Sequence, residues 1–418
     1  MHYIRLLRPV SMETTNRREE VLSVLLTITT DLGDSFFGPD EPLALGATLK
    51  TGSRARVLAC QADQTSPLQW RAGMRVLKAQ LRLREPLPRE KTTVCIFARS
   101  SGDRSKTPSN RPYWRHGYED GQTELIVPVS VDMIDRVCAP VSLRTLPLPK
   151  RADGDDASND DEHSLELGED IGESIARHIW DAGLVTASFL SDSCRSAAVM
   201  ADILPVRRDR INVLELGCGV GILGTTVAGI IWETAAAQGQ SLVEAHVLLT
   251  DVDEAEERAR ANIARAEGAL ERRRTHVGAQ ENGEEDEIEE KPRAQQVQLQ
   301  YENLDWDDGR QGAFGPLAAA RAWDVVVLSD CTYNVDSLPA LVGTLSALHR
   351  HSHSLDANTA TRVILATKPR HASEEALFGL LGEQGWSHRV VKRVPLPRVG
   401  AEDEGVEVYV LERKGGQE

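Results

Sequence analysis

Residues Ile211–Gly224 read INVLELGCGVGILG, and this stretch decides the fold that the sequence predicts. It begins with apolar residues, including Val213 and Leu214, and ends in the glycines Gly217, Gly219, Gly221 and Gly224. An apolar strand that runs into a glycine-rich turn and then a helix is how α/β sheets hold nucleotide-like ligands. Glycine has no Cβ, so the backbone can turn sharply and a ligand can approach it closely. We therefore expect a ligand-binding loop here, followed by a helix that begins near Ile222.

The glycine spacing alone leaves the ligand open. Gly219, Gly221 and Gly224 fit G-x-G-x-x-G, as in dinucleotide sites, and a tight turn in any α/β protein is the plainest alternative. Glu215 before the first glycine instead resembles the E/D-x-G-x-G-x-G loop of class I methyltransferases, which bind S-adenosylmethionine. The acidic residue after the next strand-like run is Asp251, later than the roughly 20 positions typical of a dinucleotide site. A carboxylate at this position could bind ribose hydroxyls in a dinucleotide site and in an S-adenosylmethionine site alike.

The composition of the whole chain narrows the possible functions. With 418 residues the chain is long enough for two or three domains, each with its own core. A net charge of -16 argues against a nucleic-acid partner held mainly by phosphate contacts. The six cysteines form no C-x-x-C pair, which indicates a reducing compartment and neither a disulfide framework nor a metal site. No apolar run suits a signal peptide or a membrane span, so we expect a soluble protein of the cytoplasm or nucleus.

The sequence predicts three segments. Residues 1–150 form a strand-rich region, with candidate strands at Val21–Thr29, Leu77–Arg84, Thr92–Ala98 and Leu125–Val131. Residues 151–170 contain the acidic run DGDDASNDDEH and are expected to form a solvated linker. Residues 171–418 form a larger domain, interrupted by a second acidic run at about 278–296 that we expect to be a disordered loop. The first region shows no catalytic constellation, and His116 there is expected in a surface or interdomain loop.

Strands and helices alternate through the larger domain. This rhythm predicts an α/β fold with a doubly wound, mostly parallel, seven-stranded Rossmann-like sheet, closed by an antiparallel hairpin of His388–Val394 and Val406–Glu412. A helix is expected over Ile171–Leu190, interrupted at Gly183. Ligands of such sheets bind at the carboxyl ends of the strands, where four residues fall: Gly217, Asp251, Asp305 and Asp330.

From Ile171 to Glu412 the chain resembles the seven-β-strand protein-lysine methyltransferases of the methyltransferase family 16 type, which modify non-histone proteins. The motifs that carry the resemblance are HIWDAGL (His178–Leu184), VLELGCGVGILG (Val213–Gly224), TDVD (Thr250–Asp253), LDW (Leu304–Trp306) and DCTY (Asp330–Tyr333). The resemblance implies S-adenosylmethionine as cofactor and a protein that presents a lysine as partner. We also expect that the protein is a monomer and does not bind a membrane.

The resemblance also implies roles for individual residues. The cofactor set is Trp180 on the pocket wall, Glu215, Gly217, Gly219 and Gly221 at the methionine portion, Asp251 at the ribose, and Asp305 and Trp306 at the adenine. Asp330 and Tyr333 would form the catalytic, methyl-accepting side. A carboxylate favours the ammonium form of lysine, so we assign Asp330 to capturing and orienting the lysine and not to acting as a strong base. The structural alternative is that Asp330 caps the following helix and Tyr333 packs in the core.

Four other functions stay open at this stage. Adenine-N6 methyltransferases carry prolines in the turn after the fourth strand, which Asp330–Tyr333 lacks. A small-molecule amine such as nicotinamide could be the acceptor. A non-catalytic scaffold that binds S-adenosylmethionine would often have lost Glu215, Gly219 or Asp251, which are all present. An NAD-dependent oxidoreductase would need a hydride-transfer site, for which the sequence offers no candidate.

Overall fold

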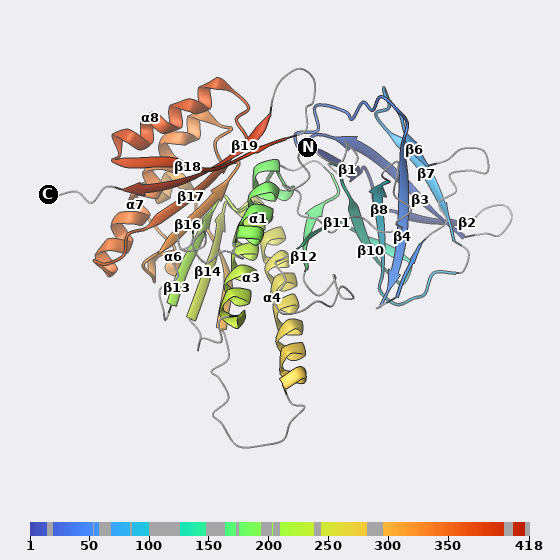
Figure 1. The fold of residues 1–418 in the computed structure, drawn as a ribbon, viewed down its shortest axis with the longest axis horizontal. Helices are drawn as coiled ribbons and strands as arrows, with labels where there is room; N and C mark the ends of the chain where they lie inside the picture. The colour runs from blue at the N-terminus through green and yellow to red at the C-terminus, as the bar shows by residue number, and fades with distance from the viewer. Residues whose placement is uncertain are drawn as a thin grey trace. The chain divides into compact units, whose positions relative to one another are not determined.

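The structure is a computed structural model (Figure 1) that describes residues 1–14, 20–52, 54–57, 68–83, 86–99, 126–147, 164–172, 175–193, 203, 210–237, 244–281, 296–396 and 404–413. The chain divides into two compact units. The first contains Met1–Thr145, Leu167–Trp180 and Pro397–Glu402, and the second contains Leu146–Glu166, Asp181–Leu396 and Asp403–Glu418. The first unit thus combines most of residues 1–150 with the separate segment Leu167–Trp180.

The second unit is built on a seven-stranded sheet with the order β15-β14-β13-β16-β17-β19-β18. Neighbours from β15 to β17 pair in parallel, whereas β19 pairs antiparallel with both β17 and β18. The strands are β13 (Arg210–Leu216), β14 (Glu244–Asp251), β15 (Gln296–Asn303), β16 (Val325–Ser329), β17 (Arg362–Thr367), β18 (Trp386–Pro395) and β19 (Gly405–Arg413). The predicted α/β class, the seven strands and the closing hairpin are all present.

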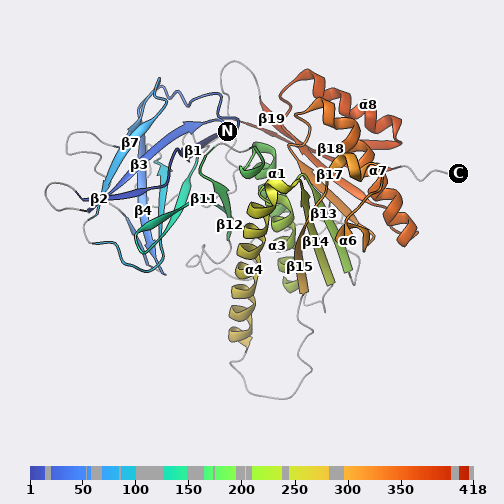
Figure 2. The same cartoon turned by 180° about the vertical axis from the view of Figure 1, so that it is seen from behind.

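Helices cover both faces of this sheet, as Figures 1 and 2 show from opposite sides. One face carries α1 (Asp181–Ser193), α3 (Ile222–Ala237) and α4 (Asp253–Glu281). The other carries α6 (Pro316–Ala319), α7 (Leu338–Leu355) and α8 (Ala376–Glu383). The second unit also contains the shorter elements α5 (Trp306–Gly309), η5 (Val335–Ser337) and η6 (Ala372–Glu375), whereas η4 (Ile175–Arg177) belongs to the first unit. Most residues of α3 are apolar, and from Ile222 to Glu233 every residue is buried.

The structure corrects the prediction of a helix over Ile171–Leu190 that is interrupted at Gly183. The α-helix begins only at Asp181, after the single 3₁₀ turn η4. Gly183 does not interrupt it but lies inside α1, where α1 approaches other parts of the unit closely. A Cβ at this position would come within 2.9 Å of Ile222 Cγ2 and 3.1 Å of Ser329 Oγ. The glycine therefore permits close packing of α1 and does not mark a helix end.

The two predicted acidic segments are also shorter than expected. Helix α4 continues to Glu281, so the first residues of the run at 278–296 are helical. The end of the predicted linker, Ser164–Asp170, forms strand β12. The acidic run at 153–163, most of the run at 278–296, and His116 lie outside the described residues.

The first unit contains two sheets, as its strand-rich sequence predicts. One has the order β2-β3-β1-β9 with β7 beside β3, and the other has the order β12-β11-β10-β8-β4-β5 with β6 beside β4. The remaining bounds are β1 (His2–Leu6), β2 (Ser11–Thr14), β3 (Glu20–Thr29), β4 (Leu43–Thr51), β5 (Arg54–Val57), β6 (Gln69–Trp70), β7 (Leu77–Arg82), β8 (Thr92–Ala98), β9 (Ile126–Val127), β10 (Val129–Ile134) and β11 (Val137–Pro147). The predicted strand Leu125–Val131 is split at Pro128, since proline has no N–H for the ladder.

A buried ion pair fixes part of the first unit. Arg144 and Glu169 are each 1% exposed, and the guanidinium also donates to the carbonyl oxygens of Ile4 and Val127. Burial alone would raise the pKa of Glu169, but Arg144 and a hydrogen bond from His178 hold that pKa well below its usual range. The pair is thus fully charged in the core, where it joins strands distant in sequence.

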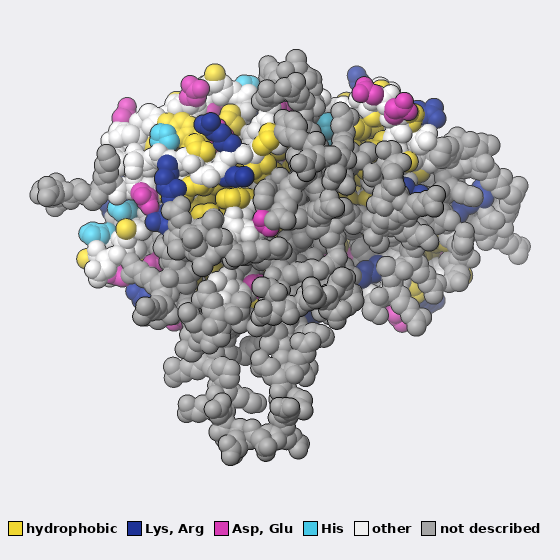
Figure 3. Space-filling model, in the orientation of Figure 1, with side chains coloured by type: hydrophobic (Ala, Val, Ile, Leu, Met, Phe, Trp, Pro, Cys, Tyr) yellow, Lys and Arg dark blue, Asp and Glu magenta, His cyan; other side chains and the backbone are white. Residues whose placement is uncertain are grey.

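The outer edge of the seven-stranded sheet carries positive charge. Strand β18 exposes His388, Arg389 and Arg393, and Figure 3 shows Lys and Arg side chains among apolar ones over the β18–β19 hairpin. Charged side chains on an edge strand discourage pairing with another sheet, which gives these residues a structural explanation. Within the described part of the chain, no helix is long and apolar enough to cross a membrane.

Candidate active site

The carboxyl edge of the parallel strands brings four predicted residues to one side of the sheet. Gly217 follows β13, Asp251 ends β14, and Asp330 follows β16. Asp305 comes two residues after the end of β15. These four strands are neighbours in the order β15-β14-β13-β16 and run in parallel, so their ends meet at a common edge.

The glycine loop adopts a conformation that other residues rarely take. Gly217, Gly219 and Gly221 have φ angles of +61°, +53° and +82°. A Cβ on Gly217 would lie 2.6 Å from Cys331 Sγ and 3.1 Å from Trp306 Cζ2. The loop is therefore packed directly against Trp306 and against the Asp330–Tyr333 turn, which joins three of the predicted motifs in one place.

Glu215 has a structural partner that the sequence did not predict. Its side chain is 1% exposed, and its two carboxylate oxygens accept hydrogen bonds from the N–H groups of Leu223 (3.2 Å) and Gly224 (2.8 Å). These donors belong to the first turn of α3, so Glu215 satisfies the free N–H groups of that helix. Burial nevertheless raises the pKa of Glu215 to about 8, with the charge of Asp251 acting in the same direction. Its contact with a methionine portion stays a prediction.

The raised pKa of Glu215 predicts a pH-dependent stability. An unfolded glutamate has a pKa of 4.5, so between pH 4.5 and about 8 the folded protein holds a proton that the unfolded chain has lost. The free energy of unfolding should therefore fall with rising pH, by up to about 1.4 kcal/mol per pH unit. We expect the stability advantage of wild type over Glu215→Gln to shrink between pH 5 and 8 in urea titrations. An advantage that does not change with pH would show that this carboxylate is ionised throughout.

Asp251 and its neighbours hold the other side of the loop. Its carboxylate accepts from Gly219 N–H and from Val252 N–H, each at 2.7 Å, and burial raises its pKa. The side chain is half-buried, and two of the roughly four acceptor positions of a carboxylate are used, so acceptor capacity remains for hydroxyl groups. The buried Asn262, in α4, donates to the carbonyl oxygen of Val220 at 2.8 Å and so braces the loop from behind.

Asp305 and Trp306 lie at the end of the neighbouring strand. Asp305 is exposed, and its carboxylate caps α5 by accepting from Asp307 N–H at 2.8 Å. Trp306 is half-buried, with its indole against the glycine loop. Trp180 directly precedes α1 but belongs to the other compact unit, so its place on a cofactor wall stays a prediction.

The carboxylate of Asp330 binds other groups of the protein. One carboxylate oxygen accepts from the N–H groups of Ala182 (2.8 Å) and Gly183 (3.1 Å), at the start of α1, and the other pairs with Arg370 at 3.3 Å. Asp330 thus caps a helix that precedes it in the sequence, not the helix that follows it. Its φ of +54° is left-handed, a conformation that aspartate tolerates better than most residues.

Tyr333 is 54% exposed, which contradicts the alternative that it packs in the core. Partial burial raises the pKa of its phenol, and the nearby Cys331, Asp251 and Glu254 act in the same direction. The hydroxyl therefore stays protonated at neutral pH and can both donate and accept a hydrogen bond. Tyr333 lies two residues after Cys331, which packs against Gly217 of the glycine loop.

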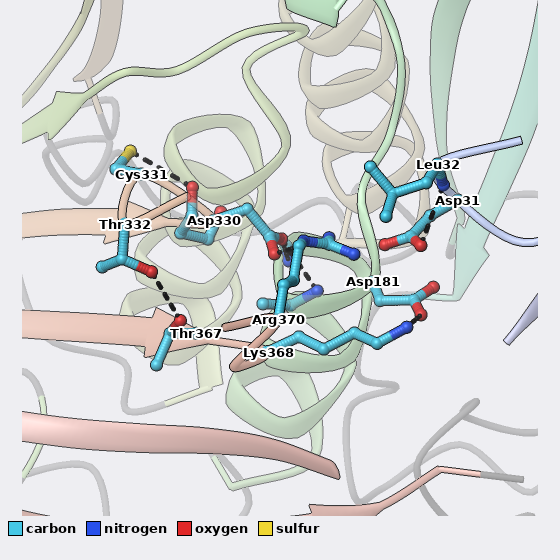
Figure 4. A network of polar contacts seen from close by, with 12 residues as sticks. Asp31, Leu32, Asp181, Asp330, Cys331, Thr332, Thr367, Lys368 and Arg370 are labelled. Carbon is cyan, nitrogen blue, oxygen red and sulfur yellow. Dashed lines mark hydrogen bonds and ion pairs between the residues drawn. The ribbon is translucent and has the colours of Figure 1, made fainter. Parts of the chain in front are cut away.

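Sequence reasoning missed three residues beside this turn. Lys368 is 6% exposed and pairs with Asp181 (3.0 Å) and with Glu404 (2.8 Å). Arg370 pairs with Asp330, and Glu374 accepts from Thr332. Figure 4 shows Lys368 and Arg370 reaching toward Asp181 and Asp330 from the segment after β17. The signal that could have found Lys368 and Arg370 is the basic sequence KPR directly after the fifth parallel strand; no such local signal marks Glu374.

The residues present fit S-adenosylmethionine. The surrounding side chains pack so closely against the loop that a Cβ would not fit at Gly217 or at Gly221. At Gly221 the Cβ would lie 2.5 Å from Leu249 Cδ2. Asp251 offers acceptors for a diol, and Trp306 offers an aromatic face beside the loop. In the described residues, no group of three or more His, Cys, Asp and Glu side chains could hold a metal ion.

Comparisons with known proteins identify the family of this chain. A sequence model of the lysine methyltransferase family matches residues 159–280 and 278–384, more than half of the chain. A UPF0665 family protein of Schizosaccharomyces pombe is 28% identical over 247 residues, which are 59% of this chain and 55% of that protein. The match thus spans little more than half the length of this relative.

Solved structures show a more distant likeness. TYW2 of Pyrococcus horikoshii, in complex with MeSAdo, is 12% identical, with a TM-score of 0.31 over 60% of this chain and 69% of that one. A SAM-dependent methyltransferase of Methanosarcina mazei is 11% identical, with a TM-score of 0.28 over 50% of this chain and 94% of that one. Because these scores are low, the assignment rests on the family match.

Proposed function

Since this chain belongs to the lysine methyltransferase family and uses S-adenosylmethionine, we propose that it methylates a lysine side chain of a non-histone protein. The observation that supports the proposal most is the contact of Gly217 with Cys331 and Trp306. It joins the glycine loop, where the cofactor would lie, to the turn Asp330–Tyr333, where the acceptor would enter. The exposed hydroxyl of Tyr333 is the polar group best placed to orient an incoming amine.

The acceptor must reach the site as a neutral amine. The cofactor supplies a methyl group on a positively charged sulfur, and the chain supplies alignment and the exclusion of water. A lysine with a pKa of about 10.4 costs about 4.6 kcal/mol to deprotonate at pH 7, and desolvation of the bound amine lowers that cost. A free carboxylate would favour the ammonium form. Asp330 instead faces Arg370 and the start of α1, so its charge is compensated. We therefore favour a role in which Asp330 fixes the turn that orients the lysine, and not one in which its carboxylate binds the lysine directly.

The partner in this proposal is a protein with an accessible lysine. The net charge of -16 would attract a basic surface and repel nucleic-acid phosphates. We further propose that the protein acts as a monomer in the cytoplasm or nucleus. A sedimentation measurement on the purified chain and fluorescence imaging of the tagged chain in cells test these two points.

The proposed function predicts selective binding and a defined product. Calorimetric titration with S-adenosylhomocysteine should give micromolar binding, and NAD should give none. A cell extract incubated with the protein and cofactor labelled in the methyl group should then yield one or a few labelled proteins, whose hydrolysate contains labelled methyl-lysine. Tyr333→Phe should lower the transfer and leave the cofactor affinity unchanged. Label on another amino acid or on a small amine would contradict the lysine assignment, whereas binding without any transfer would favour a scaffold.

A further inference from the structure

A buried group of hydrogen bonds lies behind the acceptor turn. Thr332, between Asp330 and the exposed Tyr333, is only 2% exposed. Its hydroxyl donates to Glu374 Oε2 at 2.6 Å and shares a 2.8 Å hydrogen bond with the Thr367 hydroxyl. Figure 4 shows Thr332, in the turn after β16, facing Thr367 at the end of β17. The turn is therefore held through its buried threonine, whereas the next residue, Tyr333, is exposed.

Glu374 connects this turn to a second segment. The residue is 6% exposed, and its other oxygen, Oε1, accepts from the N–H groups of Arg370 (2.8 Å) and His371 (3.0 Å). One carboxylate thus binds both the turn after β16 and the chain after β17. A buried carboxylate with three hydrogen-bond donors is compensated for the loss of water.

Further contacts link Glu374 back to the turn Asp330–Tyr333. Glu374 fixes the backbone of Arg370, whose guanidinium pairs with Asp330, and Asp330 in turn holds the start of α1. The result is a closed ring of Thr332, Glu374, Arg370 and Asp330. Tyr333 follows directly in the sequence and is the exposed member of the turn.

We propose that Glu374 and Thr332 are positioning residues that fix the acceptor turn, so that Tyr333 meets the incoming amine in one orientation. This inference rests on the proposed function for its catalytic meaning. The backbone at Asp330 is left-handed, a conformation that persists where the surroundings enforce it. The ring provides that restraint from both sides of the turn. Apolar packing alone would stabilise the fold equally well but would not fix directions as hydrogen bonds do.

The test compares the same substitution at two threonines of equal burial. Thr332→Val removes the hydroxyl that binds Glu374 and keeps the shape of the side chain. Thr361→Val is the matched control, because Thr361 is also 2% exposed and its hydroxyl donates to Trp323 O at 2.9 Å, just before the other end of β17. Each variant is measured by thermal unfolding, by titration with S-adenosylhomocysteine, by methyl transfer, and by hydrogen–deuterium exchange of the peptide that contains Asp330–Tyr333.

Thr332→Val should raise the exchange rate of the turn and lower kcat for methyl transfer at least about tenfold, with the affinity for S-adenosylhomocysteine within about twofold of wild type. Misplacement of a reacting group by about 1 Å can cost roughly 100-fold in rate. Thr361→Val should lose similar stability without either effect, and Thr332→Ser should recover most of the rate. Glu374→Gln repeats the test if Thr332→Val does not fold.

These measurements distinguish a failure of the positioning role from a failure of the proposed function. Unchanged exchange of the turn in Thr332→Val overturns the positioning role, whether or not the protein transfers methyl groups. Equal loss of rate in Thr332→Val and Thr361→Val overturns it too, because stability alone would then explain the effect. If wild type transfers no methyl group to any protein while the turn still loosens in Thr332→Val, the proposed function fails and only the restraint on the turn stands.

Discussion

Gly217→Ala is expected to lower the affinity for S-adenosylhomocysteine at least about 100-fold. Two costs combine at this position. The φ of +61° disfavours any residue with a Cβ by about 1–2 kcal/mol. The new Cβ would also lie 2.6 Å from Cys331 Sγ and 3.1 Å from Trp306 Cζ2, so the loop, the turn or the indole must move. A shift of about 1 Å in a preorganised site can cost roughly 100-fold in rate, and we expect a loss of similar size in affinity because the displaced loop no longer fits the cofactor.

The control for Gly217→Ala is Gly312→Ala. Gly312 has a comparable φ of +78°, but a Cβ there would meet nothing within 4 Å. The control should lose about 1–2 kcal/mol of stability from the backbone conformation alone and bind S-adenosylhomocysteine as wild type does. Calorimetric titration and thermal unfolding of both variants separate the two costs. Equal affinities in the two variants would mean that the close packing of Cys331 and Trp306 against Gly217 plays no part in binding.

The parts of the site that the sequence predicts are those with local signals. The glycine loop follows its strand directly, and the residues at strand ends follow from the parallel alternation, because parallel strands end at one edge. Asp251, beside Gly219, and Trp306, against Gly217, were both placed at this edge from their motifs. Neither placement required knowledge of which other residues pack nearby.

The parts that it does not predict depend on contacts between distant segments. Asp330 caps α1 across 148 positions of sequence, and Thr332 meets Glu374 across 42. No local pattern marks such a partner, since a carboxylate after a strand suits a ligand and a helix cap equally well. Gly183 was misjudged for the same reason: a glycine in a helical pattern suggests an interruption, and only the packing against Ile222 explains it. The length of α4 was missed because polar residues at its end resemble a loop.

Asp251→Ala is the second large effect that we expect, again about 100-fold in affinity for S-adenosylhomocysteine. A carboxylate that accepts from two ribose hydroxyls would contribute hydrogen bonds of about 1.5–3 kcal/mol each, and about 1.4 kcal/mol corresponds to a tenfold change. The variant also leaves the N–H groups of Gly219 and Val252 without their acceptor, so the loop should loosen. Measured affinity should therefore fall together with protection of the loop from hydrogen exchange.

Asp253→Ala separates the hydrogen bonds of Asp251 from its charge. Asp253 is the exposed first residue of α4, so its removal lowers the negative charge near the same strand end but breaks no contact with the loop. If affinity falls in Asp251→Ala alone, the carboxylate acts through directed hydrogen bonds. If both variants lose affinity equally, the site depends on its overall negative field, and the loss should then shrink at high salt because ions screen exposed charges. An Asp251→Ala protein that binds as wild type does would place the ribose elsewhere, and Tyr333 would then need a new position relative to the cofactor.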